Sequence, residues 1–219
     1  MSIKGIIFDL DGTIANSPEV QWHAFNRYLE QYHCQIPWTD WAGPYLGAKS
    51  DDIFKDVFKK YLLSIDIDEA QIKRRNIFKQ LISEGFLHEI KGFSSFYLWL
   101  TENLNLPAVI ASNGHPVSIE STLKHIGYFD KIKFFSAHKE SGRIEKSLLL
   151  QQVAQQMGLE SDQCVVFEDS VIGSSSAKEN NMKVIIVNTS KLSPKSFDAD
   201  LVVDDYTDPK LKNFLLNII

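Results

Sequence analysis

Residues 3–13 read Ile-Lys-Gly-Ile-Ile-Phe-Asp-Leu-Asp-Gly-Thr. The segment Ile3–Phe8 is short and rich in isoleucine, which is typical of a strand buried in a parallel sheet. Two acids, Asp9 and Asp11, follow where this strand ends. In open α/β sheets the ligand crevice lies at the carboxyl ends of the strands, so these acids are well placed for a functional site. A turn at Asp11-Gly12 with solvated carboxylates is the alternative interpretation.

Further segments along the chain have the same strand-like character, and helical patterns separate several of them. Ile119, Leu123 and Ile126 recur at helical spacing, and so do Leu149 and Val153. Alternating strands and helices indicate an α/β protein with a Rossmann-like parallel-sheet core. The expected strands are Ala108–Ala111, Lys133–Phe135, Val165–Phe167, Val184–Val187 and Leu201–Val203.

An insertion separates the first two strands. About 100 residues lie between Asp11 and Ser112, whereas a whole βαβ unit needs about 30. The surplus shows helical patterns with apolar stripes over 18–33, 51–62 and 68–82, the last starting with Asp68 and Gln71 at capping-box spacing. We therefore expect a helical domain at residues 16–86, inserted into a core domain formed by residues 1–15 and 87–219.

Composition excludes several classes of protein. The chain has 219 residues, 44% of them hydrophobic, and a net charge of −5. No basic cluster is longer than residues 73–75, and no stretch approaches 18 uninterrupted apolar residues. We therefore expect neither nucleic-acid binding nor a membrane span. Two cysteines and no recognisable signal peptide favour a cytoplasmic protein, expected to be a monomer or a weak homodimer.

Polar residues follow two other predicted strands in the same way. Ser112 and Asn113 come after one strand, Glu168 and Asp169 after another, and Lys146 precedes a predicted helix. Carboxylate oxygens suit Mg²⁺, whereas a hydroxyl, an amide and a lysine near a helix start suit phosphate. Considered alone, Lys146 would be interpreted as a solvated surface lysine and Ser112 as a helix cap. Together they indicate a site for a metal ion and a phosphate group, because a cation relieves the repulsion between gathered carboxylates.

With these motifs the sequence resembles the haloacid dehalogenase-like superfamily of hydrolases, in the branch with a helical cap after the first strand. The resemblance covers nearly the whole chain. The first motif is matched by residues 9–13, the second by Ser112-Asn113, the third by Lys146 and the fourth by Glu168-Asp169. The run from Phe167 to Ala177 is similar to the subfamily of phosphatases and β-phosphoglucomutases.

This resemblance implies a role for each matched residue. Asp9 would be the nucleophile and Asp11 the acid and base, while Ser112 and Lys146 would act on the transferred phosphoryl group. Mg²⁺ would be held by Asp9, Asp11, Asp169 and Glu168. The residues implied in substrate binding are Gly12, Thr13, Ser112, Asn113 and Lys146, joined by Gln21 and Lys49 from the cap.

The chain departs from the family pattern at two sites that bear on function. The prolines that relatives carry around the third motif are missing, which leaves Arg143 as an alternative to Lys146 for the cation. Gln21 stands where mutases carry a cap histidine. In the cap, Lys49 is interpreted either as a ligand of a second anion or as a solvated lysine. Trp38 and Trp41 either stack on the substrate or pack within the domain.

The implied activity is that of a Mg²⁺-dependent phosphatase acting through an aspartyl-phosphate on a small phosphorylated metabolite, of the sugar-phosphate or phosphoglycolate type. The aspartate at position 11 favours phosphate esters, because a halide leaves without protonation. Two alternatives remain: a phosphosugar mutase of the β-phosphoglucomutase type, and a catalytically silent binding or regulatory module. The acids at positions 9, 11 and 169 argue against the silent module, which has no need for mutually repelling carboxylates.

Overall fold

The computed structural model describes residues 2–46, 48, 50–139 and 142–219. The chain forms two compact units, unit 1 comprising Met1–Asn16 and His88–Ile219, and unit 2 comprising Ser17–Leu87. Each division falls one residue beyond the one predicted from the sequence pattern. The units are described separately below.

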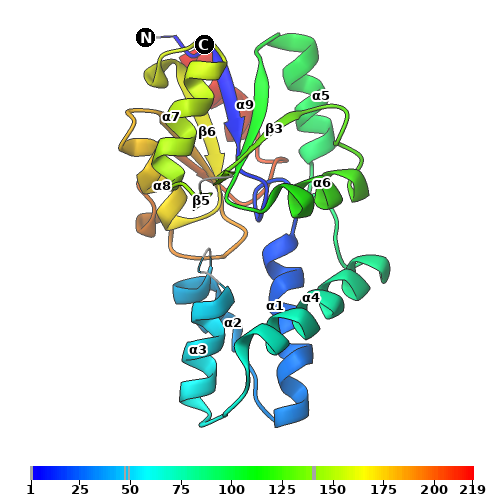
Figure 1. The fold of residues 1–219 in the computed structure, drawn as a ribbon. Helices are drawn as coiled ribbons and strands as arrows, with labels where there is room; N and C mark the ends of the chain where they lie inside the picture. Colours follow the sequence, from blue (N-terminus) through cyan, green and yellow to red (C-terminus); the bar gives the residue numbers. More distant parts are fainter. Residues whose placement is uncertain (1, 47, 49, 140–141) are drawn as a thin grey trace. The chain divides into compact units, whose positions relative to one another are not determined.

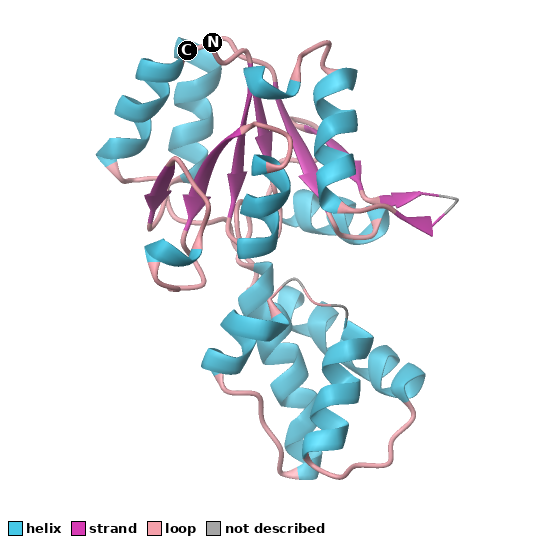
Figure 2. Ribbon diagram, turned by 90° about the vertical axis from the view of Figure 1, so that its left-hand side faces the viewer, coloured by secondary structure: helices cyan, strands magenta, loops and turns pink. Residues whose placement is uncertain are grey.

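A six-stranded parallel sheet forms the centre of unit 1, with strand order β3-β2-β1-β6-β7-β8 (Figures 1 and 2). The expected parallel α/β core is therefore confirmed. The strands are β1 (Gly5–Phe8), β2 (Ala108–Ser112), β3 (Lys133–Ser136), β6 (Cys164–Glu168), β7 (Lys183–Val187) and β8 (Leu201–Val203).

Helices cover both faces of this sheet, as Figure 2 shows. On one face Ile7 of β1 belongs to a hydrophobic cluster that includes Leu150 of α7. On the other face Phe8 meets Phe93 of α5 edge to face, with ring centroids 5.5 Å apart. Alternate residues of β1 therefore enter two different cores, which is why the strand is apolar throughout. The helices of unit 1 are α5 (Phe93–Asn103), α6 (Pro116–His125), α7 (Lys146–Gln156), α8 (Val171–Lys178) and α9 (Pro209–Ile218).

Shorter elements complete unit 1. A two-stranded antiparallel ribbon, β4 (His138–Lys139) and β5 (Gly142–Arg143), follows β3 directly. Two 3₁₀ turns, η3 (Ser161–Gln163) and η4 (Pro194–Ser196), precede β6 and β8. The sequence pattern indicates neither the ribbon nor the turns, since elements of two or three residues carry no periodicity.

Unit 2 is helical, as expected for the inserted segment. Its core is rich in aromatic side chains, and the rings of Phe25 of α1 and Phe54 of α3 pack at a tilt with their centroids 4.8 Å apart. Trp41 is buried in this core and Trp38 packs against it, so both tryptophans serve packing within the unit. The elements are α1 (Ser17–Leu29), η1 (Glu30–Tyr32), α2 (Trp38–Asp40), η2 (Trp41–Tyr45), α3 (Ser50–Lys60) and α4 (Ile67–Ser83).

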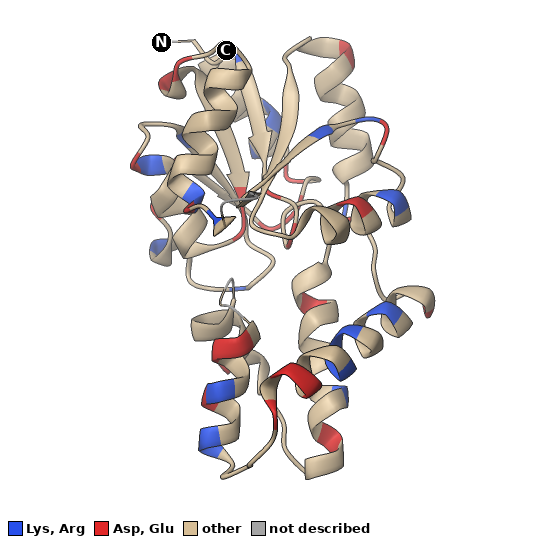
Figure 3. Ribbon diagram, in the orientation of Figure 1, with Lys and Arg blue, Asp and Glu red and all other residues tan. Residues whose placement is uncertain are grey.

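Charge is mixed along the chain. Figure 3 shows Lys and Arg interspersed with Asp and Glu in the helices of both units. Within the described part of the chain, no helix has the length and apolar character needed to span a membrane.

Candidate active site

Three neighbouring strands of unit 1 bring the predicted site residues to one edge of the sheet. In register, Phe8 of β1 pairs with Ile110 of β2 on one side and with Phe167 of β6 on the other. Asp9 follows β1, Ser112 ends β2 and Asp169 follows β6. Because the strands are parallel and aligned, motifs more than 100 residues apart in sequence meet at their carboxyl ends.

A buried lysine occupies the centre of this group. Lys146, the first residue of α7, is only 4% exposed. Its Nζ donates to Asp9 Oδ1 at 2.5 Å and to the carbonyl oxygen of Ala111 at 2.7 Å. Arg143, the alternative cation from the sequence, is exposed on β5. Lys146 is therefore the cation that contacts Asp9.

The carboxylates around Lys146 repel one another strongly. Burial, together with the charges of Glu168 and Asp11, raises the pKa of Asp9 to about 7, while Lys146 opposes the rise. Burial and the charges of Glu168, Asp9 and Asp11 likewise hold the pKa of Asp169 well above its ordinary value. Burial disfavours the charged form of Lys146, but Asp9 and Glu168 outweigh this and raise its pKa. One lysine thus faces more negative charge than it can neutralise.

Both carboxylate oxygens of Glu168 have partners within unit 1. Its Oε2 accepts hydrogen bonds from the backbone N–H groups of Asp169 and Ser170, at 3.0 and 3.1 Å, and from the Ser170 hydroxyl at 2.9 Å. Its Oε1 pairs with Lys146 Nζ at 3.1 Å. Oε2 thus shapes the turn after β6 and Oε1 contacts the lysine, while a role of Glu168 as a metal ligand stays a prediction.

The predicted phosphate-binding residue Ser112 contacts the second acid of the first motif. The Ser112 hydroxyl donates to Asp11 Oδ2 at 3.4 Å and accepts from the Gly114 N–H at 2.9 Å. Two buried oxygens, Asn113 Oδ1 and Thr13 Oγ1, have no hydrogen-bond partner among the described residues. Buried polar atoms left unpaired cost free energy, which points to a polar ligand at this edge of the sheet.

Two residues that the sequence pattern does not indicate hold the loop after β1. The Thr189 hydroxyl donates to the carbonyl oxygen of Gly12 at 2.9 Å, and the Tyr206 hydroxyl donates to that of Thr13 at 3.1 Å. Gly12 adopts φ 87°, a conformation that favours glycine. No local motif marks Thr189 or Tyr206, because both reach the loop from the far end of the chain.

Two further residues predicted to bind substrate belong to the cap segment. Gln21 lies on α1 of unit 2, where its Oε1 accepts a hydrogen bond from the buried guanidinium of Arg74. Lys49 lies outside the described residues.

The described carboxylates suit a hard divalent cation. Asp9 and Asp169 are both buried, and the charge of Asp9 helps to raise the pKa of Asp169, a repulsion that a dication would relieve. Among the described residues no set of three or more His, Cys, Asp or Glu side chains forms a ready-made metal-ligand group. Mg²⁺ needs no such group, since it typically binds one or two carboxylates and completes its shell with water and phosphate oxygens. Asp9 and Asp169 therefore fit Mg²⁺.

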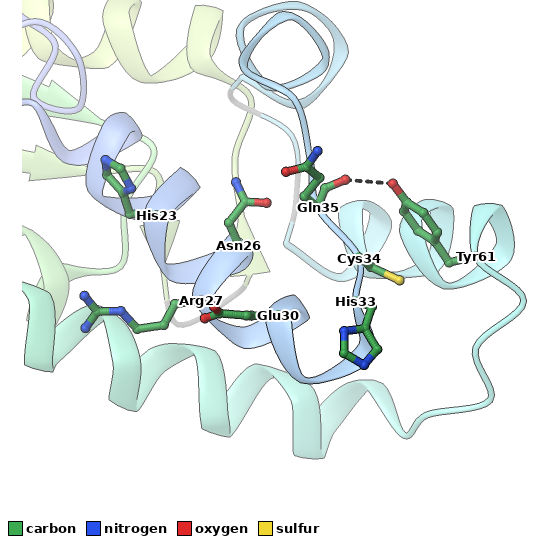
Figure 4. Close-up of a pocket in the computed structure, with 8 residues that line it drawn as sticks. All are labelled: His23, Asn26, Arg27, Glu30, His33, Cys34, Gln35 and Tyr61. Atoms are coloured by element: carbon green, nitrogen blue, oxygen red, sulfur yellow. Dashed lines mark hydrogen bonds between the residues drawn. The ribbon is translucent and has the colours of Figure 1, made fainter.

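Unit 2 contains a separate polar pocket of about 580 Å³ beside α1 (Figure 4). Several of the polar side chains that line it are engaged within the unit. Arg27 pairs with Glu84 at 3.1 Å, and the Tyr61 hydroxyl donates to the carbonyl oxygen of Gln35 at 2.8 Å. The described residues that line this pocket include no lysine, so they form no carboxylate–lysine pair like that of Asp9 and Lys146.

Comparison with known proteins identifies the relatives of the chain. The model of the haloacid dehalogenase-like hydrolase family matches residues 6–187. A putative phosphatase, YhcW of Bacillus subtilis, is 26% identical over 93% of this chain and 89% of its own length. The fructose-1-phosphate phosphatase YqaB of Escherichia coli is 24% identical over 84% of this chain and 95% of its own. A hydrolase of this family from Deinococcus radiodurans, solved with bound phosphate and sodium, superposes with a TM-score of 0.80 at 18% identity, over 99% of this chain and 96% of that one.

Proposed function

Because the chain belongs to the haloacid dehalogenase-like hydrolases, we propose that it is a Mg²⁺-dependent phosphatase acting on a phosphate monoester of a small metabolite. The observation that carries this proposal is the buried pair of Asp9 and Lys146 at the carboxyl end of β1, with Asp11 and Ser112 beside it. Phosphatase relatives such as YhcW and YqaB support the same reaction class.

Asp9 is the proposed nucleophile. Its Oδ attacks phosphorus, the bond from phosphorus to the leaving oxygen breaks, and an aspartyl-phosphate forms. Attack needs the ionised carboxylate, which burial disfavours and the contact with Lys146 Nζ favours. Lys146 therefore keeps Asp9 reactive and also presents a cation to the phosphoryl oxygens.

Asp11 is the proposed proton carrier. It protonates the leaving oxygen in the first step and accepts a proton from the attacking water in the second, a role that contributes about 10²–10⁴ in rate. The hydrogen bond from the Ser112 hydroxyl orients the Asp11 carboxylate. Asn113 and the loop N–H groups supply further donors to the phosphate.

Asp9, Asp169 and the backbone carbonyl of Asp11 are the proposed protein ligands of Mg²⁺. When bound, the ion supplies positive charge that offsets the repulsion between the carboxylates and the incoming phosphate. We further propose that unit 2 selects the substrate, with Gln21 and Lys49 as candidate contacts, as the cap of this family implies.

The test is a screen of phosphorylated metabolites and p-nitrophenyl phosphate with Mg²⁺ or with EDTA. We expect phosphate release that needs Mg²⁺, that Asp9→Asn abolishes because an amide cannot attack phosphorus, and that the exposed control Asp198→Asn leaves unchanged. Near-normal activity in freshly purified Asp9→Asn protein would refute the nucleophile assignment. No Mg²⁺-dependent release from any ester would favour a silent module.

A second arm separates hydrolysis from phosphoryl shuttling. The protein is given β-glucose 1-phosphate with a trace of glucose 1,6-bisphosphate, and glucose 6-phosphate is measured against free phosphate. We expect free phosphate, because Gln21, whose amide is engaged by Arg74, cannot change protonation state between the steps as a histidine does. Efficient formation of glucose 6-phosphate with little free phosphate would show a mutase.

A further inference from the structure

Three basic side chains of unit 1 gather beside the phosphate-binding loop, and the proposed reaction uses none of them. His115 follows Ser112–Gly114 directly and is the N-cap of α6. Its ring lies 5.4 Å from that of His138 on β4, measured between centroids. His138 pairs with Arg143 across the β4–β5 ribbon, and cross-strand partners project to the same face. The three side chains thus belong to one surface, made by α6 and the ribbon.

Hydrogen bonds fasten this surface to the phosphate-binding loop. The Ser136 hydroxyl donates to the carbonyl oxygen of Gly114 at 2.7 Å and accepts from the His138 N–H at 3.0 Å. The His138 side chain also hydrogen bonds to the backbone of Asn113. The ribbon is therefore held against the residues that receive the phosphate, and its basic groups are next to that position within the same unit.

The described residues give this cluster no acidic partner. Burial, then the charges of Arg143 and His115, lower the pKa of His138, so its surroundings disfavour a further cation. No carboxylate among the described residues forms an ion pair with Arg143, His115 or His138. Glu120, the acid of α6, is paired with Lys124 at 2.5 Å. An anionic ligand would supply the partner that these basic groups lack among the described residues.

We propose that His115, His138 and Arg143 form a second anion subsite, so that the substrate carries a carboxylate or a second phosphate besides the phosphate that is hydrolysed. The inference rests on the proposed function and narrows its substrates to monoesters that carry a second anionic group, called doubly anionic below. Arg143 is the principal ligand, because a guanidinium matches the two oxygens of a carboxylate or phosphate. The His115 Nδ1 accepts from the Val117 N–H at 3.3 Å, which leaves its Nε2–H as a donor.

Matched substrate pairs test the subsite. One pair is 2-phosphoglycolate and 2-hydroxyethyl phosphate, which differ by a carboxylate. The other is fructose 1,6-bisphosphate and fructose 1-phosphate, which differ by a phosphate. For each pair we measure the ratio of kcat/KM values in the wild type, in Arg143→Gln, in His138→Gln and in Lys4→Gln. Lys4 is exposed and precedes β1, at the opposite end of the strand, so its variant loses the same charge elsewhere in unit 1.

We expect the wild type to prefer the doubly anionic member of at least one pair by roughly 10- to 100-fold, the range of a charge-assisted hydrogen bond. Arg143→Gln should bring that ratio close to one, His138→Gln should lower it, and Lys4→Gln should leave it unchanged. The pair that responds identifies the anion as carboxylate or phosphate. A ratio near one in the wild type, or an equal ratio in Arg143→Gln, would overturn the subsite.

A binding measurement separates this inference from the proposed function. Calorimetry of the same four compounds with Asp9→Asn, and with Asp9→Asn combined with Arg143→Gln, reports affinity without turnover. If the wild type hydrolyses no monoester, the proposed function fails. The subsite still stands when the doubly anionic compounds bind more tightly and lose that advantage with Arg143→Gln, and it falls when they do not.

Discussion

The carboxyl group of Glu168 lies against the α-carbon of Gly173, in the space that a β-carbon would fill. The Ser170 hydroxyl joins the two residues, since it donates to Glu168 Oε2 at 2.9 Å and accepts from the Gly173 N–H at 3.0 Å. Glu168 in turn pairs with Lys146 at 3.1 Å. A glycine on α8 therefore determines where the acid beside the candidate catalytic lysine can sit.

Replacing this glycine should disturb the site from a distance. In Gly173→Ala the added methyl group would displace the Glu168 carboxylate, and we expect at least a tenfold loss of kcat/KM with a stability loss of about 1–3 kcal/mol, typical of overpacking. Gly43→Ala is the control, because nothing lies within 4 Å of a β-carbon there. Activity assays and thermal melts of both variants check this, and wild-type activity in Gly173→Ala would contradict it.

Removing Asp169 should weaken the response to Mg²⁺ without harming the fold. Asp169→Ala relieves repulsion among the carboxylates, so we expect an unfolding temperature without metal equal to that of the wild type or higher. Mg²⁺ should raise that temperature in the wild type and much less in the variant, because a ligand stabilises only the state that binds it. Titrations of Mg²⁺ against activity and against the melting temperature test both statements, with exposed Asp130→Ala as control. An unchanged half-saturating concentration would remove Asp169 from the metal site.

Tyr206 should matter for activity although it lies far from the motifs in sequence. Its buried hydroxyl donates to the carbonyl oxygen of Thr13 at 3.1 Å, and Tyr206→Phe leaves that oxygen unpaired, at a cost of about 1 kcal/mol. We expect a several-fold fall in kcat/KM from a less ordered loop after β1. Tyr97→Phe is the matched control, since it removes a similar bond, from Tyr97 Oη to the carbonyl of Lys131 at 3.1 Å, on α5. Equal effects of the two variants on kcat/KM would refute the role of Tyr206.

Asp200 should stabilise the folded state, and this stabilisation should be lost at low pH. Burial alone would raise its pKa, but hydrogen bonds from Lys178, Lys183 and the Val184 N–H hold the pKa of Asp200 below its ordinary value. A lowered pKa means that the contribution is fully present above the unfolded-state pKa of about 3.9 and is lost as pH falls through the folded-state value.

We therefore expect Asp200→Asn to be less stable than the wild type by about 1–3 kcal/mol at pH 7. The difference should shrink as pH falls below about 5. Urea unfolding between pH 3 and 7 measures it, with Asp198→Asn as the exposed control. A difference that stays constant over this range would contradict the assignment.

Much of the fold is readable from local pattern. The continuous apolar run of β1 and the stripes of the unit 2 helices predict their elements because each residue's burial follows from its own position in a strand or helix. The local pattern predicts the ends of helices less well. Helix α4 begins at Ile67 with Asp66 as its N-cap, and the predicted capping residue Gln71 instead donates to Asp51. Helix α5 escapes a pattern search, because exposed Leu98 lies among its buried aromatic residues and obscures the stripe.

The candidate site likewise contains residues that the sequence indicates and contacts that only the structure shows. Asp9, Asp11, Ser112 and Asp169 are recognisable in sequence, because each follows a strand and the carboxyl ends of parallel strands share one edge. Other features are visible only in the tertiary structure. Lys146, and not Arg143, is buried against Asp9. Glu168 shapes the turn after β6, and Tyr206 holds the loop after β1. These roles depend on distances between residues remote in sequence, and a one-dimensional pattern carries no information about such distances.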